Sequence, residues 1–593
     1  MTNWRRWSWP LIAALYLPVV SAFAAESVLD EVTPGSGKDR LRVGLVLGGG
    51  GARGAAHIGV LKELERLRIP VDAIAGTSMG AIVGGLYATG MSAQELEDLV
   101  GSLDWAGALT DKPDRADLSF RRKQDDAEFP INFELGVRGT ELVLPKGVIQ
   151  GQELVLLLRE LTLRVSHIED FDQLPIPLRV IASDIERGEA WVMKEGDLAK
   201  SIRASMSVPA VFAPVRIGDR LLVDGGIVGN LPIEVMQEMD VDVILAVDVE
   251  FPLYSLEELG SVLTISEQML TILIRKETLR QIERLGDRDV LIRPELGLYA
   301  STNFSDILST IEPGVTAARE QSAKLADISL DQAAWVEHLA QRQEPATPSS
   351  QLAFVRVVHD GKLAPAVLES KLSVEAGDPI DPSLLALNAD RLYGLELYEQ
   401  VSYKLVEEDS GIGVEYHART KSWGPNFLQF GISLEDDFEG STAFNLGARL
   451  TRAGVNRMGA EWRNDFKLGT DPGIYSEFYQ PLSVDSRLFV APHITLMQTN
   501  IDAFVMESTV ARLRLSEATG GLDFGREFGR VGEFRVGVFR GTGEARVKVG
   551  DPSIPHIDFK TGGAFARVRF DTLDNARCPR SGLRSDLQWT LSR

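Results

Sequence analysis

From Phe427 onward, apolar and polar residues alternate with a period of two, which predicts β-strands rather than helices. The run 459–468 shows the pattern most clearly, because one of its faces is aromatic and aliphatic while the other is charged. Its apolar face carries Ala460, Trp462, Phe466 and Leu468, and its charged face carries Glu461, Arg463, Asp465 and Lys467. The runs 427–434 and 444–450 repeat this alternation.

A sheet with aromatic residues on one side and charges on the other has two structural interpretations. A transmembrane barrel requires such a pattern, with the apolar face toward lipid and the charged face toward a wet interior. A soluble β-sandwich gives the same alternation with the apolar face turned inward. The single cysteine, Cys578, excludes a disulfide within the chain, and the charge-rich second face favours the barrel.

The N-terminus has the pattern of a secretory signal peptide over residues 1–25. Arg5 and Arg6 precede an apolar stretch that ends near Val20, and Ala22-Phe23-Ala24 supplies a small-residue cleavage site. The apolar stretch is interrupted by prolines and is short for a bilayer, which takes about 20 residues. We therefore expect export, and no later window reads as a transmembrane helix.

Residues 41–250 alternate short apolar runs with helical patterns, which predicts βαβ units and a buried parallel sheet. Residues 257–340 read as helical throughout and extend this first domain, which spans 26–340. A linker rich in proline and serine follows at 341–352. The expected strands are 42–47, 71–75, 178–183 and 241–249, and the expected helices are 55–68 and 81–89.

Residues 353–420 predict a small α+β unit of order β-α-α-β-β, with strands at 353–358, 401–406 and 413–416. Its two helices are expected at 364–371 and 381–393, the second starting with Asp-Pro. The net charge of the chain is −23, from 85 acidic and 62 basic residues, which argues against nucleic acid as a partner.

The sequence Gly76-Thr-Ser-Met-Gly80 places a serine between an expected strand and an expected helix. This is the arrangement of a nucleophile elbow, where flanking glycines permit a sharp turn that exposes the hydroxyl of Ser78. A glycine-serine turn that only caps the helix is the structural alternative.

The run Gly48-Gly-Gly-Gly-Ala-Arg-Gly54 follows a strand and opens a helix, which allows two functions. A dinucleotide-binding loop has this spacing, but it needs an acidic residue after the second strand, and the chain has Ala75-Gly76 there. The other function is an oxyanion hole, in which the amides of Gly49, Gly50 and Gly51 face a tetrahedral intermediate. Loops that leave adjacent parallel strands at the same edge would face one crevice.

A nucleophilic serine needs a base, and none of the seven histidines has a convincing loop context. His57 lies within the first helix, where a packing role is expected, and His167 is only a weak candidate for the base. Asp224 follows an apolar run and precedes Gly225 and Gly226, so its carboxylate is expected at a strand end. A Ser-Asp dyad therefore fits better than a triad, and a plain Asp-Gly turn is the alternative.

Taken in order, these three motifs resemble the patatin-like phospholipases, as do Ser207-Val-Pro-Ala210 and Asn230-Leu-Pro232. The resemblance covers residues 41–250 and implies a three-layer α/β/α fold, Ser78 as nucleophile and Asp224 as general base. It implies Gly49–Gly51 as the oxyanion loop, Arg53 as the loop's basic residue, and no metal ion or other cofactor. Gly54, Gly76, Gly80, Gly225 and Gly226 complete the matched motifs.

Two further resemblances concern the rest of the chain. Residues 353–420 resemble a polypeptide-transport-associated (POTRA) domain, and 424–593 resemble the barrels of outer-membrane translocators, including the segments 571–575 and 579–582. The whole order is similar to type Vd autotransporters. Related barrels have sixteen strands, whereas 424–593 has room for about ten, so we expect a partial barrel.

The sequence thus predicts a multidomain lipid acyl hydrolase of phospholipase A type, fused to an outer-membrane barrel. Its partners would be a phospholipid or other lipid ester and the membrane lipid around the barrel, with the N-terminal domain at the bacterial cell surface or secreted. Two alternatives stay open: a thioesterase or carboxylesterase of the same fold, and a non-enzymatic transport or assembly protein.

Overall fold

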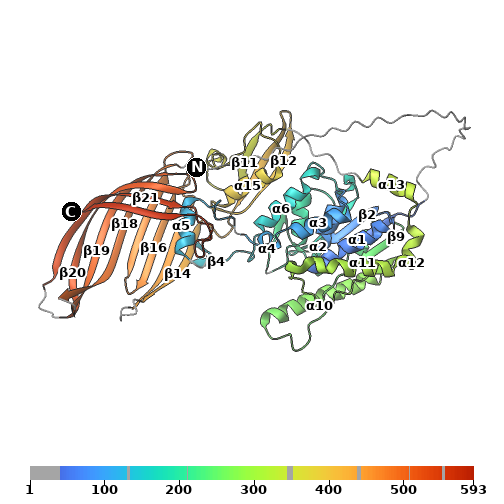
Figure 1. Cartoon of the computed structure of the whole chain (residues 1–593), viewed down its shortest axis with the longest axis horizontal. Helices are drawn as coiled ribbons and strands as arrows, with labels where there is room; N and C mark the ends of the chain where they lie inside the picture. The colour runs from blue at the N-terminus through green and yellow to red at the C-terminus, as the bar shows by residue number, and fades with distance from the viewer. Residues whose placement is uncertain are drawn as a thin grey trace, which may run out of the picture. The chain divides into compact units, whose positions relative to one another are not determined.

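The computed structural model describes residues 40–592 apart from 112, 130–133, 210, 343–350, 437–441, 486, 506–507 and 551–554. The expected signal peptide and most of the expected linker lie outside these residues. The described strands form three sheets, of eight, three and eleven strands (Figure 1). Among the described helices, none is both long and apolar enough to cross a bilayer.

The eight-stranded sheet has the order β10-β9-β1-β2-β5-β8-β7, with β6 paired to β5. The pairs β10/β9, β9/β1, β1/β2 and β2/β5 are parallel, as the βαβ pattern predicts, whereas β8 runs antiparallel to β5. Its strands are β1 (Val43–Leu47), β2 (Ala73–Thr77), β5 (Leu178–Asp184), β6 (Glu189–Met193), β7 (Val215–Ile217), β8 (Arg220–Asp224), β9 (Val243–Val247) and β10 (Val290–Ile292).

Helices cover both faces of this sheet, which confirms the three-layer α/β/α prediction. Leu45 and Leu47 of β1 belong to one apolar cluster and Val46 belongs to another, as successive strand residues point to opposite faces. The first cluster packs against α1 (Ala56–Arg66), α2 (Met79–Ala88), α7 (Leu198–Ser205) and α11 (Ile311–Glu320). The second packs against α9 (Ile233–Gln237), which also contacts α10 (Val262–Ile282).

The sequence predicts that the region 257–340 is helical throughout. This prediction is wrong, because β10 lies within the region. This run of three apolar residues pairs with β9 in parallel. The pairing supplies hydrogen bonds to its backbone, and its apolar side chains are removed from water. The region otherwise consists of α10, the 3-10 helix η4 (Phe304–Thr310), α11, α12 (Ser322–Leu325), η5 (Ala326–Ile328) and α13 (Gln332–Gln341).

The small domain has its elements in the predicted β-α-α-β-β order: β11 (Val355–His359), α14 (Pro365–Glu369), α15 (Pro382–Tyr393), β12 (Tyr398–Glu408) and β13 (Gly411–Thr420). Its sheet order is β11-β13-β12. Leu156 of α6 (Gln152–Thr162) joins the apolar core of this domain. Gln152 also donates to the carbonyl of Val401 at 2.9 Å and accepts from its amide at 2.8 Å.

The large sheet consists of β14–β22 and the hairpin β3–β4, and every adjacent pair is antiparallel. Residues 424–592 supply nine strands, fewer than the ten expected, because β18–β20 are 18 to 20 residues long. The bounds are β14 (Asn426–Asp436), β15 (Thr442–Arg452), β16 (Glu461–Gly469), β17 (Gly473–Pro481), β18 (Leu488–Val505), β19 (Ser508–Glu527), β20 (Gly532–Gly550), β21 (Ile557–Asp571) and β22 (Arg584–Ser592).

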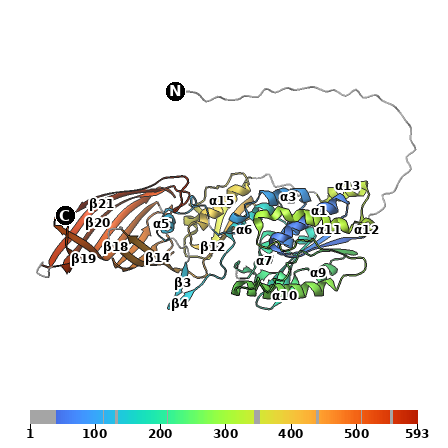
Figure 2. The same ribbon diagram turned by 60° about the horizontal axis from the view of Figure 1, so that its bottom comes forward.

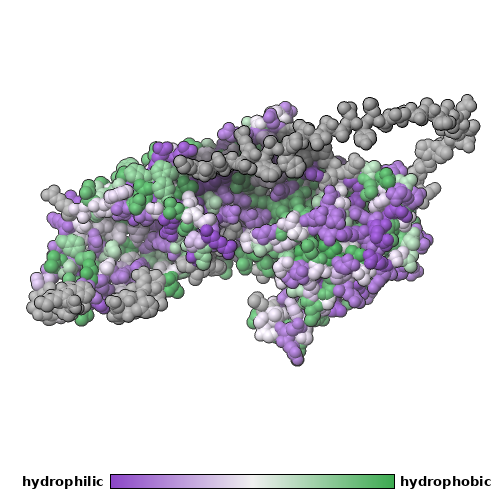
Figure 3. Space-filling model, in the orientation of Figure 1, coloured by the Kyte–Doolittle hydropathy of each residue, from purple (hydrophilic) through white to green (hydrophobic). Residues whose placement is uncertain are grey.

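The apolar face of the large sheet is the exposed one. Trp462 is 48% exposed, and Phe430, Ile432 and Leu468 are exposed as well. Their charged neighbours Arg449, Glu461 and Arg463 are buried instead. Figure 3 shows hydrophobic residues on the visible surface of this part of the molecule. A soluble β-sandwich would bury this face, so the pattern of burial fits a lipid-facing sheet.

A segment from the first domain adds two strands to one edge of the large sheet. The sequence does not predict this pairing. The strand β3 (Leu135–Arg138) pairs with β14 through Gly136 opposite Phe427, and β4 (Glu141–Val143) pairs with β3 (Figure 2). The preceding helix α5 (Phe120–Glu128) contacts the charged face. Arg121 of α5 lies 3.0 Å from a carboxylate oxygen of Glu461.

Candidate active site

Ser78 lies on the turn that joins β2 to α2, as the sequence predicts. Its backbone has φ 54° and ψ −121°, an uncommon conformation for a residue with a side chain. Such strain is typical of a nucleophile elbow. A Cβ atom on Gly76 would lie 2.5 Å from the carbonyl oxygen of Gly80, and one on Gly80 would lie 2.2 Å from the carbonyl oxygen of Leu47. The turn is therefore open only to glycine at these two positions.

The glycine-rich loop approaches Ser78 closely. It connects β1 to the 3-10 helix η1 (Gly51–Ala55), and a Cβ atom on Gly49 would lie 3.1 Å from the Cβ of Ser78. Gly51 has φ 56°, which favours glycine, and its α-carbon packs against the carbonyl of Ser301. The two loops thus face one another because β1 and β2 are adjacent and parallel.

The amides of this loop differ in their availability. The Gly49 N–H donates to the carbonyl of Asn230 at 3.3 Å. Within the described residues, the amides of Gly50 and Gly51 have no hydrogen-bond acceptor. The predicted set of three donors is therefore narrowed to two that are free to bind an oxyanion.

Arg53 anchors the glycine-rich loop rather than facing the nucleophile. Its Nε donates to the carbonyl of Val249 at 3.0 Å, and its terminal nitrogens donate to the carbonyls of Glu250, Gly297 and Tyr299. Burial lowers the pKa of Arg53 to about 10, so the side chain stays charged at neutral pH. The sequence assigns no role to Arg53. These hydrogen bonds indicate that it fixes the position of the glycine-rich loop.

Asp224 ends β8 and is buried beside the turn of the nucleophile. Its Oδ1 accepts the N–H of Gly226 at 2.7 Å, while Oδ2 has no hydrogen-bond partner among the described residues. Burial raises the pKa of Asp224 to about 6, and the Gly226 amide and the Ser78 hydroxyl both act to lower it. A carboxyl group with a pKa near 6 can accept a proton at neutral pH.

Gly225 and Gly54, two further glycines of the matched motifs, lie at close contacts with neighbouring segments. A Cβ on Gly225 would lie 2.3 Å from the carbonyl oxygen of Ile181 and 3.0 Å from the Cγ2 of Thr77. Gly54 packs against Met79, where a Cβ would lie 2.3 Å from a side-chain carbon. The turn that carries Asp224 therefore contacts the residue that precedes the nucleophile.

Neither His57 nor His167 forms a hydrogen bond with Ser78 in the described structure. His57 is fully buried, and its Nε2 lies 2.8 Å from the carbonyl oxygen of Gly48, so it braces the glycine-rich loop from behind. Burial lowers the pKa of His57 to about 4, which keeps the ring neutral. His167 is exposed on a turn after α6.

Sequence reasoning assigned no role to two residues that hold this site together. Asn230 accepts the Gly49 amide through its backbone, and its Oδ1 lies where a Cβ on Gly49 would approach within 2.6 Å. Ser205 accepts the N–H of Ser78 at 2.9 Å. Asn230 stands in the matched Asn-Leu-Pro motif, whereas no local signal marks Ser205.

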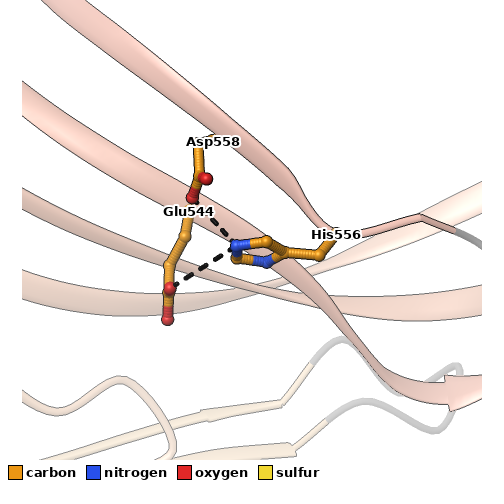
Figure 4. Close-up of side chains that lie close together, drawn as sticks. All are labelled: Glu544, His556 and Asp558. Atoms are coloured by element: carbon orange, nitrogen blue, oxygen red, sulfur yellow. Dashed lines mark ion pairs between the residues drawn. The ribbon is translucent and has the colours of Figure 1, made fainter.

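A possible metal-binding cluster lies far from this site along the chain. Glu544, His556 and Asp558 of the large sheet offer three ligand atoms within 4.8 Å of one another (Figure 4). His556 already pairs with Asp558 at 2.9 Å, and Arg546 pairs with Glu544 at 2.7 Å. Because all three groups are at least partly exposed and already have side-chain partners, the cluster is explained by contacts between surface side chains.

Comparison with known proteins assigns the first domain to a class. Residues 45–236 match the family model described as patatin-like phospholipase, so this segment forms a patatin-type α/β domain. An uncharacterized NTE family protein of Mycobacterium tuberculosis is 33% identical over 211 residues, which are 36% of this chain and 50% of that protein. The chain thus spans about half the length of this relative.

Two longer relatives carry names that describe an activity. A lysophospholipase of Mycosarcoma maydis is 33% identical over 35% of this chain and 10% of its own length. The human patatin-like phospholipase domain-containing protein 6 is 31% identical over 35% of this chain and 13% of its own length.

Two solved structures are similar to parts of the chain. BamA from Haemophilus ducreyi, lacking POTRA domains 1–3, has a TM-score of 0.31 and 14% identity, over 40% of this chain and 48% of that one. VipD from Legionella pneumophila has a TM-score of 0.26 and 16% identity, over 49% and 67%. TM-scores this low do not establish a shared fold.

Proposed function

We propose that this protein is a lipid acyl hydrolase of phospholipase A type that uses Ser78 as nucleophile and Asp224 as general base. The observation that carries the proposal is the pairing of a strained serine with a buried carboxylate that has a free oxygen and no cationic partner among the described residues. The match of residues 45–236 to the patatin-like phospholipase model supports lipid esters as the substrate class.

The first half of the reaction forms an acyl-enzyme. The Ser78 oxygen attacks the ester carbonyl while Asp224 takes the hydroxyl proton, and the carbonyl oxygen becomes an oxyanion. The free amides of Gly50 and Gly51 donate to that oxyanion, and the start of α2 adds partial positive charge. When the tetrahedral intermediate collapses, the proton passes from Asp224 to the departing alcohol.

The second half releases the fatty acid. Asp224 takes a proton from water, whose oxygen attacks the acyl carbonyl, and the proton returns to Ser78 as the carboxylic acid leaves. Because the base must be ionised, kcat/KM is expected to rise with pH through about 6, the pKa of Asp224.

Active-site labelling tests the chemistry directly. The full-length chain in detergent is treated with a fluorophosphonate probe and assayed for fatty acid release from phosphatidylcholine and lysophosphatidylcholine. We expect labelling and hydrolysis in the wild type and neither in Ser78→Ala. Equal labelling of both proteins would refute Ser78 as nucleophile, and hydrolysis of acyl thioesters in preference to phospholipids would favour the thioesterase alternative.

We infer a membrane location for the large sheet from its exposed apolar face. The order of the domains motivates a further hypothesis: the sheet belongs to an outer-membrane barrel, and the hydrolase domain is displayed at the cell surface. Protease treatment of intact cells tests it. Digestion of the domain supports surface display, whereas a domain that is digested only after permeabilisation contradicts it.

A further inference from the structure

The C-terminal end of α7 lies between the two turns of the candidate active site (α7 is labelled in Figure 2). We propose that Ser205, the last residue of α7, is a positioning residue that sets the separation of Ser78 from Asp224. This inference rests on the proposed function, because it concerns the same reaction.

The hydroxyl of Ser205 links the nucleophile turn to the strand beside it. Its Oγ accepts the backbone N–H of Ser78 at 2.9 Å and donates to the carbonyl of Ile181 at 2.5 Å. Ile181 lies opposite Thr77 in the β2/β5 register. Ser205 is fully buried, so water cannot replace either bond.

The backbone next to this hydroxyl holds the turn that carries the base. The carbonyl of Ser205 accepts the N–H of Gly225 at 3.2 Å, and the carbonyl of Ser207 accepts the N–H of Asp224 at 2.9 Å. Ser207 is itself fixed by Arg203, whose guanidinium donates to its hydroxyl at 2.6 Å. Ser205 therefore contacts the backbone of Ser78, and Ser207 contacts the backbone of Asp224.

These contacts are chemically suited to positioning. Ser78 has a strained backbone, and such a conformation persists only when its surroundings hold it. Without the Ser205 hydroxyl, the Ser78 amide loses its acceptor in the interior, and the turn is free to relax away from Asp224. The free Oδ2 of Asp224 would then lie farther from the hydroxyl that it must deprotonate.

Three variants of the full-length chain test the role of Ser205. Ser205→Ala removes the hydroxyl without adding volume, and Ser205→Thr retains it. Ser201→Ala is the matched control, because Ser201 is a buried serine of the same helix with no side-chain hydrogen bond to either turn in the described structure. Fatty acid release from phosphatidylcholine, fluorophosphonate labelling rate and thermal unfolding are measured for each.

We expect Ser205→Ala to lower kcat and the labelling rate by roughly 100-fold with KM unchanged, because a nucleophile displaced by about 1 Å costs rate rather than binding. Ser205→Thr should recover most of the rate, and Ser201→Ala should match the wild type. A Ser205→Ala variant with wild-type kcat would overturn the inference while leaving the proposed function intact. A loss that Ser201→Ala shares would also overturn it, since a general defect of α7 would explain both. A wild-type chain with no hydrolysis and no labelling would refute the proposed function itself, and this inference with it.

Discussion

Two buried carboxylates of this protein differ in the cations beside them. Asp224, at the end of β8, is 8% exposed, and no described lysine, arginine or histidine forms an ion pair with it. Glu461, at the start of β16, is 6% exposed and lies next to Arg121, Arg122 and Arg463. The functional group and its burial are nearly the same, while the local electrostatics are opposite.

The difference separates a group that can exchange a proton near neutral pH from a structural one. Removing a carboxylate from water favours its protonated form unless a cation compensates. Burial without a cation raises the pKa of Asp224 to about 6, so this group can exchange a proton near neutral pH. Around Glu461 the guanidinium groups compensate the buried charge, and two of them belong to α5. Glu461 therefore links α5 to the large sheet.

The largest effect is expected from Asp224→Asn, which retains the shape of the side chain but removes the proposed base. Loss of a catalytic group of this kind costs about 10⁴-fold or more in kcat. Steady-state hydrolysis of phosphatidylcholine by the full-length chain measures it. Asp219→Asn, at an exposed aspartate before β8, is the control and should retain full activity. An active Asp224→Asn enzyme would show that the unpaired carboxylate is not the base.

The next effect is on stability, from Glu461→Gln. Neutralising one partner of a buried ion-pair cluster leaves arginine charges uncompensated, which costs about 3–5 kcal/mol. Urea unfolding of the detergent-solubilised chain, followed by tryptophan fluorescence, measures the change. Glu517→Gln is the comparison, because no ion pair to Glu517 exists within the described residues. Equal stability of these two variants would mean that the cations around Glu461 do not stabilise the fold.

The pH dependence of the unfolding free energy should reveal that Asp224 is buried without a compensating cation. Its pKa is raised from 3.8 to about 6, so the folded state binds the proton more tightly than the unfolded state. The resulting stabilisation is fully present below about pH 4 and is lost as pH rises through about 6, a change of about 3 kcal/mol. The difference in unfolding free energy between the wild type and Asp224→Asn, measured from pH 4 to 8, reports it. A difference that does not vary with pH would contradict the raised pKa.

The smallest effect is expected at the exposed cluster of Figure 4. His556→Gln removes the imidazole that lies 2.9 Å from Asp558, and exposed polar pairs of this kind contribute about 0–1 kcal/mol. The urea midpoint of this variant should stay within error of the wild type. A loss comparable to that of Glu461→Gln would show that this cluster does more than pair at the surface.

Local chemistry made much of the α/β domain predictable. The strand-serine-helix order around Ser78 specifies a sharp turn, and the observed φ of 54° has that form. The adjacency of β1 and β2 follows from the βαβ pattern, so the sequence also predicts that Gly49 and Ser78 face one crevice. The period of two from Phe427 likewise predicts both the strands and their two faces.

Features that depend on distant partners were not predictable in this way. The strand β3 pairs with β14, and α5 bonds to β16, yet residues 120–143 carry no signal that distinguishes them from loops and helices of the first domain. Ser205 is one of many serines, and only the packing of α7 brings its hydroxyl to the Ser78 amide.

The sequence alone predicted the candidate reactive residues of this protein and determined which faces of its strands are apolar, because periodicity and turn chemistry act over a few residues. Only the tertiary structure decided that Asp224 is buried without a cation while Glu461 is surrounded by three. A charge interacts with every group near it in space, and the distances to those groups are set by the whole fold rather than by neighbours in the chain.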